Sequence, residues 1–216
     1  MLRPYQQNIK HNLFEAWRQY PSVMVQMPTG TGKTHLLASV ISDRMMADDT
    51  ASVWIVAHRR ELVEQIEETV ARYGISKDDG RVKVMSIQWL SKHWEDVKDE
   101  RPGLIVIDEA HHALAGTYRE LWLRYPNAKK LGTTATPCRL NRKGFTDLFD
   151  TLITSDSIAD FIRQGWLSTF DYVSIRPDSE EQRLINGLER RGADGDFQVK
   201  EMDTVLNKAT KYRKAV

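Results

Sequence analysis

The sequence has little cysteine and no excess of charge of either sign. Cys138 is the only cysteine among 216 residues, which excludes an intrachain disulfide and a metal site built from several thiolates. Lysine and arginine together number 31 and aspartate and glutamate 30, which gives a formal net charge of +1. A balanced charge does not by itself indicate nucleic-acid binding, so that function has to be argued from particular residues.

Long apolar runs are also absent. The apolar runs are short and strand-like, and the opening residues Met-Leu-Arg-Pro-Tyr-Gln lack the apolar segment of a signal peptide. We therefore expect a cytoplasmic protein without a membrane segment. At 216 residues the chain has room for one sizeable α/β domain with an appendage, but it is short of two full lobes.

A glycine-rich stretch at residues 27–34, Met-Pro-Thr-Gly-Thr-Gly-Lys-Thr, lies between a strand-like and a helix-like segment. Gly30 and Gly32 permit backbone conformations in which successive N–H groups point at a polyphosphate, beside the positive end of the next helix. Lys33 would then reach the β- and γ-phosphates of a nucleotide, and the Thr34 hydroxyl would bind Mg²⁺. The stretch therefore predicts a phosphate-binding loop that takes ATP with Mg²⁺.

One position of this loop departs from the strict pattern, which begins with Gly or Ala. Met27 occupies that position. Several nucleotide-binding families tolerate other residues there, so the prediction stands. A glycine-rich turn that merely precedes Lys-Thr is the alternative interpretation.

Two adjacent acids follow a second apolar run. Residues 104–107, Leu-Ile-Val-Ile, indicate a buried strand that ends in Asp108 and Glu109. Nucleotide sites in open parallel sheets lie at the carboxyl ends of the strands. Asp108 would hold Mg²⁺ directly or through water, and Glu109 would orient and deprotonate an attacking water. Solvated acids in a turn are the alternative, but a phosphate-binding loop independently requires such a pair.

Strand-like and helix-like segments alternate along the chain. Strands are predicted at 23–25, 52–57, 82–85, 104–107 and 130–133, and helices at about 4–18, 61–73 and from 158. A strand over 170–175 and charge-rich helices over 180–191 and 201–214 follow. This alternation predicts an α/β fold with a mostly parallel central sheet and helices on both faces.

Taken in order, these motifs resemble the first RecA-like lobe of the superfamily-two helicases and translocases, in the DEAD/DEAH-related branch. The matching stretches are residues 3–6, 27–34, 56–62, 108–111 and 134–137. The resemblance implies a RecA-like P-loop NTPase fold, with residues 1–170 as the ATP-binding lobe. Residues 171–216 would then be an exit strand and charged helices leading toward a second lobe that this chain lacks.

The resemblance also implies roles for single residues. Gln6 would read the adenine and Arg3 would pack on the base. The residues that bind ATP and Mg²⁺ would be Thr29, Gly30, Thr31, Gly32, Lys33 and Thr34. His111, Thr134 and Thr136 would link the nucleotide site to nucleic acid and to the second lobe.

Contacts with DNA or RNA are predicted at the ends of two strands. Arg59 and Arg60 follow one strand, a place from which a guanidinium reaches backbone phosphates. They could instead be solvated or pair with nearby glutamates. Ser86 and Gln88 follow the next strand, where hydroxyl and amide groups could meet phosphate oxygens.

The expected function is nucleic-acid-stimulated ATP hydrolysis that drives strand movement or unwinding in a longer protein. Alternatives are the motor subunit of a restriction or remodelling complex, a nucleotide-gated clamp with little turnover, and an NTPase without a nucleic-acid partner. An arginine finger from a second lobe contributes about 10³ to 10⁵ in rate. We therefore expect this chain alone to be weakly active or inactive.

Overall fold

The computed structural model describes residues 2–48, 50–58, 60–75, 80–110, 116–136 and 148–170. The chain divides into two compact units, one made of Met1–Cys138 and Gly144–Leu167 and the other of Arg139–Lys143 and Ser168–Val216. Nearly all of the described residues belong to the first unit. The predicted strand over 170–175, apart from its first residue, and the predicted charged helices lie outside the described residues. The boundary at residue 170 stays a prediction.

A six-stranded sheet in the order β3-β2-β4-β5-β1-β6 forms the centre of this unit. Its strands are β1 (Ser22–Gln26), β2 (Val53–Ala57), β3 (Val82–Ser86), β4 (Leu104–Ile107), β5 (Lys129–Thr134) and β6 (Thr151–Thr154). All of the pairings between these strands are parallel. The predicted α/β fold with a mostly parallel sheet is confirmed.

The strands are apolar on both faces because helices cover both faces. Alternate side chains of a strand point to opposite sides of the sheet, and in β1 Val23 and Val25 join one hydrophobic cluster while Met24 joins the other. This two-sided burial explains why the sequence shows short continuous apolar runs instead of an apolar and polar alternation.

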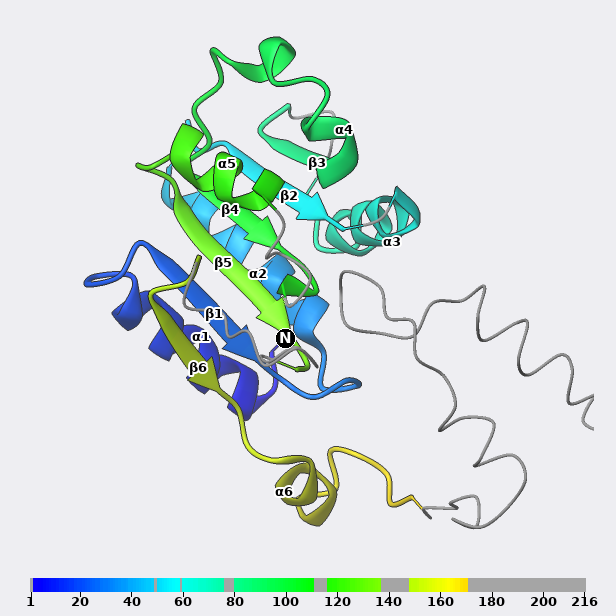
Figure 1. The fold of residues 1–216 in the computed structure, drawn as a ribbon. Helices are drawn as coiled ribbons and strands as arrows, with labels where there is room; N and C mark the ends of the chain where they lie inside the picture. The colour runs from blue at the N-terminus through cyan, green and yellow to red at the C-terminus, as the bar shows by residue number, and fades with distance from the viewer. Residues whose placement is uncertain are drawn as a thin grey trace, which may run out of the picture. The chain divides into compact units, whose positions relative to one another are not determined.

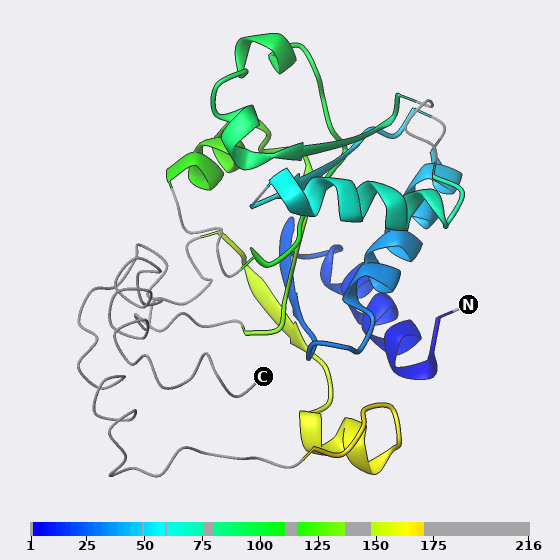
Figure 2. The same ribbon diagram turned by 90° about the vertical axis from the view of Figure 1, so that its right-hand side faces the viewer.

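Three helices pack on one face of the sheet and two on the other (Figures 1 and 2). The first face carries α1 (Pro4–Ala16), α2 (Lys33–Ala47) and α3 (Arg60–Ala71). The second carries the one-turn α4 (Ile87–Leu90), a 3₁₀ turn at Glu95–Val97, and α5 (Gly116–Arg124). A short helix, α6 (Ile158–Arg163), follows the last strand. Within the described residues, no helix has the length and apolar character needed to cross a membrane.

The sequence did not predict β6 or α5. The strand β6 is short, with the sequence Thr-Leu-Ile-Thr and no fully buried residue, because it lies at the edge of the sheet and pairs only with β1 among the described strands. Its apolar signal is therefore two residues long. In α5 only Tyr118 and Leu121 are buried. The basic residues of this segment therefore dominated the sequence pattern and hid the helix.

Candidate nucleotide site

The carboxyl ends of all six strands lie at one edge of the sheet, because the strands are parallel. The last residue of β1, Gln26, stands beside Thr134 of β5, and Ile107 of β4 stands beside Gly132 of the same strand. The strand β5 thus separates β1, which leads into the glycine-rich loop, from β4, which leads into the two acids. This arrangement brings three predicted motifs to the centre of one edge.

The loop after β1 has the backbone conformation that its glycines were expected to allow. Gly30 has φ +82° and Gly32 has φ +81°, both in the left-handed region. The helix α2 begins at Lys33, so its free N–H groups and positive end face the loop. The buried Thr31 hydroxyl donates to the Pro28 carbonyl at 2.6 Å and closes the turn.

Met27, which departs from the strict motif, is completely buried. Its side chain belongs to the hydrophobic cluster beneath α1 and α2. Its backbone N–H donates to the Thr134 carbonyl at 2.9 Å, and its carbonyl accepts from Lys33 Nζ at 3.5 Å. Met27 therefore extends β1 into the core, and only its backbone faces the loop.

The structure brings Lys33, Asp108 and Glu109 together. Lys33 Nζ lies 4.0 Å from Glu109 Oε1, and the Lys33 side chain is 10% exposed. Asp108 Oδ1 accepts from the Glu109 backbone N–H at 3.0 Å. One ammonium and two carboxylates from opposite sides of β5 thus meet at the rim of the sheet. Their roles in nucleotide chemistry stay predictions.

Glu109 is held in an unfavourable state by its surroundings. Its φ of +49° lies in the left-handed region, and it is the sole described residue other than glycine with a positive φ. Burial raises the pKa of its carboxyl group, the charge of Asp108 raises it further, and Lys33 lowers it. Backbone strain and a raised pKa are features that cluster at functional sites.

Thr133 was not singled out in the sequence, yet it orients Asp108. The Thr133 side chain is fully buried, and its hydroxyl donates to Asp108 Oδ1 at 2.7 Å. A carboxylate that holds a metal commonly has such a supporting hydrogen bond. The sequence feature that could have indicated Thr133 is the pair of threonines at the end of β5. The resemblance to helicases points only to the second of them, Thr134.

Gln6 and Arg3 lie beside the loop. The buried Gln6 donates from Nε2 to the carbonyls of Thr31 at 2.9 Å and Gly32 at 3.2 Å, and its Oε1 accepts from the Arg3 backbone N–H at 2.9 Å. These residues line a cavity of about 300 Å³ together with Gly30 and His35. Both amide hydrogens of Gln6 thus point to loop carbonyls, so donating to an adenine would require the release of one. Its adenine-reading role stays a prediction, and His35 was not anticipated.

The remaining predicted contacts are only partly described. Arg59 and His111 lie outside the described residues, and for Arg60 only the backbone at the start of α3 is described. The Thr134 hydroxyl accepts from the Thr136 N–H at 3.1 Å and donates to the Thr136 carbonyl at 3.0 Å, which forms a tight turn beside the loop.

Ser86 and Gln88 stand at the carboxyl end of β3. The Ser86 hydroxyl oxygen accepts from the Trp89 N–H and caps α4, and the exposed Gln88 amide donates to the His58 carbonyl at the end of β2. Both side chains thus take part in local structure. Whether they also contact nucleic acid stays a prediction.

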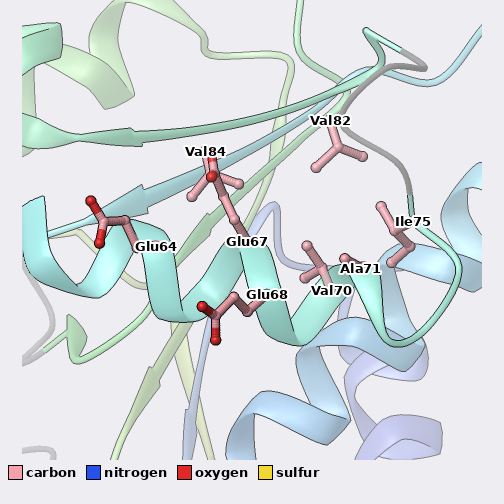
Figure 3. Close-up of a pocket in the computed structure, with 8 residues that line it drawn as sticks. All are labelled: Glu64, Glu67, Glu68, Val70, Ala71, Ile75, Val82 and Val84. Atoms are coloured by element: carbon pink, nitrogen blue, oxygen red, sulfur yellow. The ribbon is translucent and has the colours of Figure 1, made fainter.

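A larger hollow of about 470 Å³ lies away from this site, between α3 and β3 (Figure 3). Its floor is apolar, and its rim carries the carboxylates of Glu64, Glu67 and Glu68. The described residues that line it include no cation, so it has no group that would attract a phosphate. The smaller cavity at the loop is the better candidate for a nucleotide.

The residues at the loop fit Mg²⁺ and a polyphosphate. Two left-handed glycines and the start of α2 form a cradle of N–H groups, and a Cβ on Gly32 would stand 2.5 Å from Gln6 Nε2. Hydroxyl and carboxylate oxygens, available here from Thr34 and Asp108, are ligands that Mg²⁺ prefers. Among the described residues no cluster of histidine, cysteine and acids offers another metal site.

Comparison with known proteins agrees with this geometry. The family described as "Type III restriction enzyme, res subunit" matches residues 1–139. The "51.5 kDa protein" of Lactococcus phage (isolate 7-9) is 27% identical over 86% of this chain and 38% of its own length. The "Putative ATP-dependent helicase IRC3" of Saccharomyces cerevisiae is 23% identical over 96% of this chain and 33% of its own length.

Solved structures share the fold at low identity. The Hef helicase domain of Pyrococcus furiosus has a TM-score of 0.59 at 18% identity, over 95% of this chain and 54% of that one. The SWI2/SNF2 ATPase core of Sulfolobus solfataricus, in complex with double-stranded DNA, has a TM-score of 0.52 at 19% identity, over 63% of this chain and 32% of that one. The chain spans about a third of the length of these two sequence relatives. It belongs to the type III restriction enzyme res subunit family, and its fold is the N-terminal RecA-like lobe of a superfamily-two helicase.

Proposed function

We propose that the chain is the ATP-binding lobe of a helicase or translocase that couples nucleic-acid-stimulated ATP hydrolysis to movement along a strand. The observation that carries this proposal is the convergence of Lys33 and Glu109, whose Nζ and Oε1 are 4.0 Å apart. These residues come from loops after two strands that are not neighbours. Membership of a family that contains helicase-like relatives supports the same conclusion.

The loop and Lys33 bind the phosphates in this proposal. The N–H groups at the start of α2 point at the anion, and Lys33, held by the Met27 carbonyl and near Glu109, adds a positive charge. The Thr34 hydroxyl and the Asp108 carboxylate would hold Mg²⁺, which would neutralise charge on the phosphates. Thr133 keeps Asp108 in place through its hydrogen bond of 2.7 Å.

Glu109 orients the attacking water and accepts its proton. A general base works best when its pKa lies near the working pH, and burial raises the pKa of Glu109 in that direction. The carboxyl group must be deprotonated to act, so the rate falls as the pH drops through this raised pKa. The proton passes from the water to Glu109 as the water oxygen attacks the γ-phosphorus, and the bond from the γ-phosphorus to the β–γ bridging oxygen breaks, so that ADP leaves.

DNA or RNA is the proposed stimulating partner. The solved SWI2/SNF2 core, which shares this fold, is in complex with double-stranded DNA. Of the predicted contact residues, Ser86 ends β3 and Gln88 comes shortly after it, so both stand at the edge of the sheet that also carries the nucleotide site. Two further predicted contacts with nucleic acid are Arg59 and Arg60. The proposed link from the nucleic acid to the nucleotide site consists of His111, Thr134 and Thr136.

The experiment that tests this function measures ATP hydrolysis by a protein that carries this lobe and its second lobe, with and without single- or double-stranded nucleic acid. Glu109→Gln should lower the stimulated rate by about 10² to 10⁴-fold while ATP binding persists. A stimulated rate that survives this substitution would instead identify a clamp that does not depend on turnover. Absence of salt-dependent binding to any strand would favour an NTPase without such a partner.

A second candidate is a motor that moves along DNA without separating its strands. The family description, a restriction enzyme subunit, favours it. Displacement of a triplex-forming strand without separation of the duplex would identify such a motor, whereas strand separation would identify a helicase.

A further inference from the structure

The residue after the α6 turn, Trp166, lies beside the nucleotide site although α2 ends much earlier in the chain, at Ala47. The helix α6 begins with a capping box in which the Ser157 and Asp160 side chains each bond the other's backbone N–H. It ends at Arg163, and Gly165, which follows the C-cap residue, has a φ of +75°. The Trp166 N–H donates to the Phe161 carbonyl at 2.8 Å, and the Gly165 N–H donates to Ile162 at 3.0 Å. This Schellman motif fixes the direction in which Trp166 leaves the helix.

Trp166 contacts two residues at the start of α1. The Arg3 guanidinium carbon lies 5.1 Å from the centre of the Trp166 ring, and the Tyr5 ring meets it edge-on at 5.5 Å. Tyr5 also packs edge-on against Phe161 at 4.9 Å. The Trp166 side chain is nevertheless 37% exposed. Trp166 is therefore a partly exposed residue that contacts Arg3, and it does not belong to the central core.

The same segment is joined to the phosphate loop. The Tyr5 hydroxyl donates to the Thr31 carbonyl at 2.9 Å. A Cβ on Gly30 would stand 3.2 Å from Leu167 Cδ2, so the loop and the chain after Trp166 are in close contact. Arg3 and Gly30 both line the cavity of about 300 Å³ beside the loop. Trp166 and Leu167 thus lie next to Arg3 and Gly30, two of the residues that line this cavity.

An arginine stacks on a nucleobase when its guanidinium plane lies parallel to the ring of the base. A guanidinium is planar and has two faces, and the guanidinium carbon of Arg3 lies over the Trp166 ring, 5.1 Å from its centre. Cation–π contact stabilises such an arrangement. Together with the hydrogen bond from Arg3 Nη1 to the Tyr5 hydroxyl at 3.3 Å, this contact restricts a flexible side chain that would otherwise sample many rotamers before each binding event. If the indole covers one face of the guanidinium, the opposite face can receive a stacking base, because Arg3 also lines the cavity beside the loop.

We infer that Trp166 is a positioning residue of the nucleobase site, where it holds Arg3 for stacking against a purine and ties α6 to nucleotide binding. This inference rests on the proposed function, because it assumes that the base of a nucleotide enters beside the loop. It adds a residue from the far end of the lobe to that site. A purine is favoured over a pyrimidine because its larger ring system covers more of the guanidinium face.

The test compares the binding of Mg–ATP, Mg–CTP and Mg–tripolyphosphate to the 216-residue chain by calorimetry. Tripolyphosphate occupies the loop but has no base. Trp166→Ala should weaken ATP binding about three- to tenfold, the order expected from loss of a cation–π contact, and should reduce the preference for ATP over CTP. Tripolyphosphate affinity should not change. Trp166→Phe should restore most of the ATP affinity, and Trp89→Ala, which removes another exposed tryptophan, should have no effect.

Two results would overturn the inference. Unchanged ATP affinity in Trp166→Ala would show that Arg3 does not need Trp166 to bind the base. An equal loss of ATP and tripolyphosphate affinity would show that Trp166 supports the loop as a whole and not the base site. The proposed function itself fails if the unsubstituted chain binds neither ATP nor tripolyphosphate. It also fails if Lys33→Ala binds both of them as tightly as the unsubstituted chain does. In either case the inference about Trp166 fails with it.

Discussion

Glu109 carries costs in the folded protein that ordinary surface residues do not. Its backbone lies in the left-handed region at φ +49°, and burial raises the pKa of its carboxyl group. A strained conformation of this kind costs about 1 to 3 kcal/mol and persists only where the surroundings impose it. The hydrogen bond from its N–H to Asp108 and the nearby Lys33 are part of those surroundings.

The raised pKa of Glu109 predicts how stability depends on pH. The folded state binds this proton more tightly than the unfolded chain does, so the stabilisation is fully present below the unfolded pKa and is lost as the pH rises through the folded-state pKa. Urea denaturation between pH 4 and pH 8 should show this loss, and Glu109→Gln should flatten the profile. Glu64→Gln, an exposed carboxylate on α3, is the control. Identical profiles for the original chain and Glu109→Gln would contradict the assignment.

Thr133 offers a second test at the scale of single residues. Thr133→Val removes the hydroxyl that donates to Asp108 at 2.7 Å and keeps the size of the side chain. Loss of a supporting hydrogen bond to a metal-binding group typically lowers metal affinity 10- to 100-fold. The Mg²⁺ concentration that half-saturates ATP binding should therefore rise by about that factor.

Thr133→Ser keeps the hydroxyl and serves as the matched control. It should retain the Mg²⁺ dependence of the original chain. An unchanged Mg²⁺ requirement in Thr133→Val would mean that Asp108 does not hold the metal or does not need Thr133 to do so.

At the scale of elements, β5 sets the spacing of the site because it lies between β4 and β1. A Cβ on Gly132 would stand 2.5 Å from Phe149 Cζ and 2.8 Å from Ala110 Cβ. Ala110 directly follows Glu109 in the chain, so the small residue on β5 lets the turn after β4 approach the sheet.

Gly132→Ala should therefore destabilise the protein by about 1 to 3 kcal/mol through overpacking, measured by urea denaturation. The matched control is Gly116→Ala at the start of α5, where a Cβ meets nothing within 4 Å. It should be neutral or stabilising by up to about 1 kcal/mol, because alanine favours a helix. Equal effects of the two substitutions would contradict the packing argument.

The sequence predicted elements well where one local pattern dominated. Buried parallel strands such as β2 and β4 appear as short apolar runs, and the glycine-rich loop has a fixed spacing. Prediction failed for β6, whose stability comes from pairing with β1 instead of from its own two apolar residues. Boundaries also moved, since α1 ends at Ala16 rather than Arg18.

At the scale of the whole molecule, the closeness of Lys33 and Glu109 was expected from the sequence, but the contacts around them were not. The order of the strands brings residues 33 and 109 together, and a resemblance was enough to expect it. The contacts of Gln6 with Thr31 and of Trp166 with Arg3 span long stretches of chain. No local spacing signals such contacts, because they arise from the way α1 and α6 pack beside the loop.

The central claim is that Lys33, Asp108 and Glu109 share one triphosphate site at the carboxyl edge of the sheet. Its most direct test is the affinity of the chain for Mg–ATP, measured by calorimetry with and without Lys33→Ala. We expect measurable binding by the original chain and an affinity about 10- to 100-fold lower in Lys33→Ala, as for loss of a hydrogen bond between charged groups. Lys98→Ala, which removes an exposed lysine paired with Glu95, should bind as the original chain does. Equal affinity in the original chain and Lys33→Ala would contradict the account.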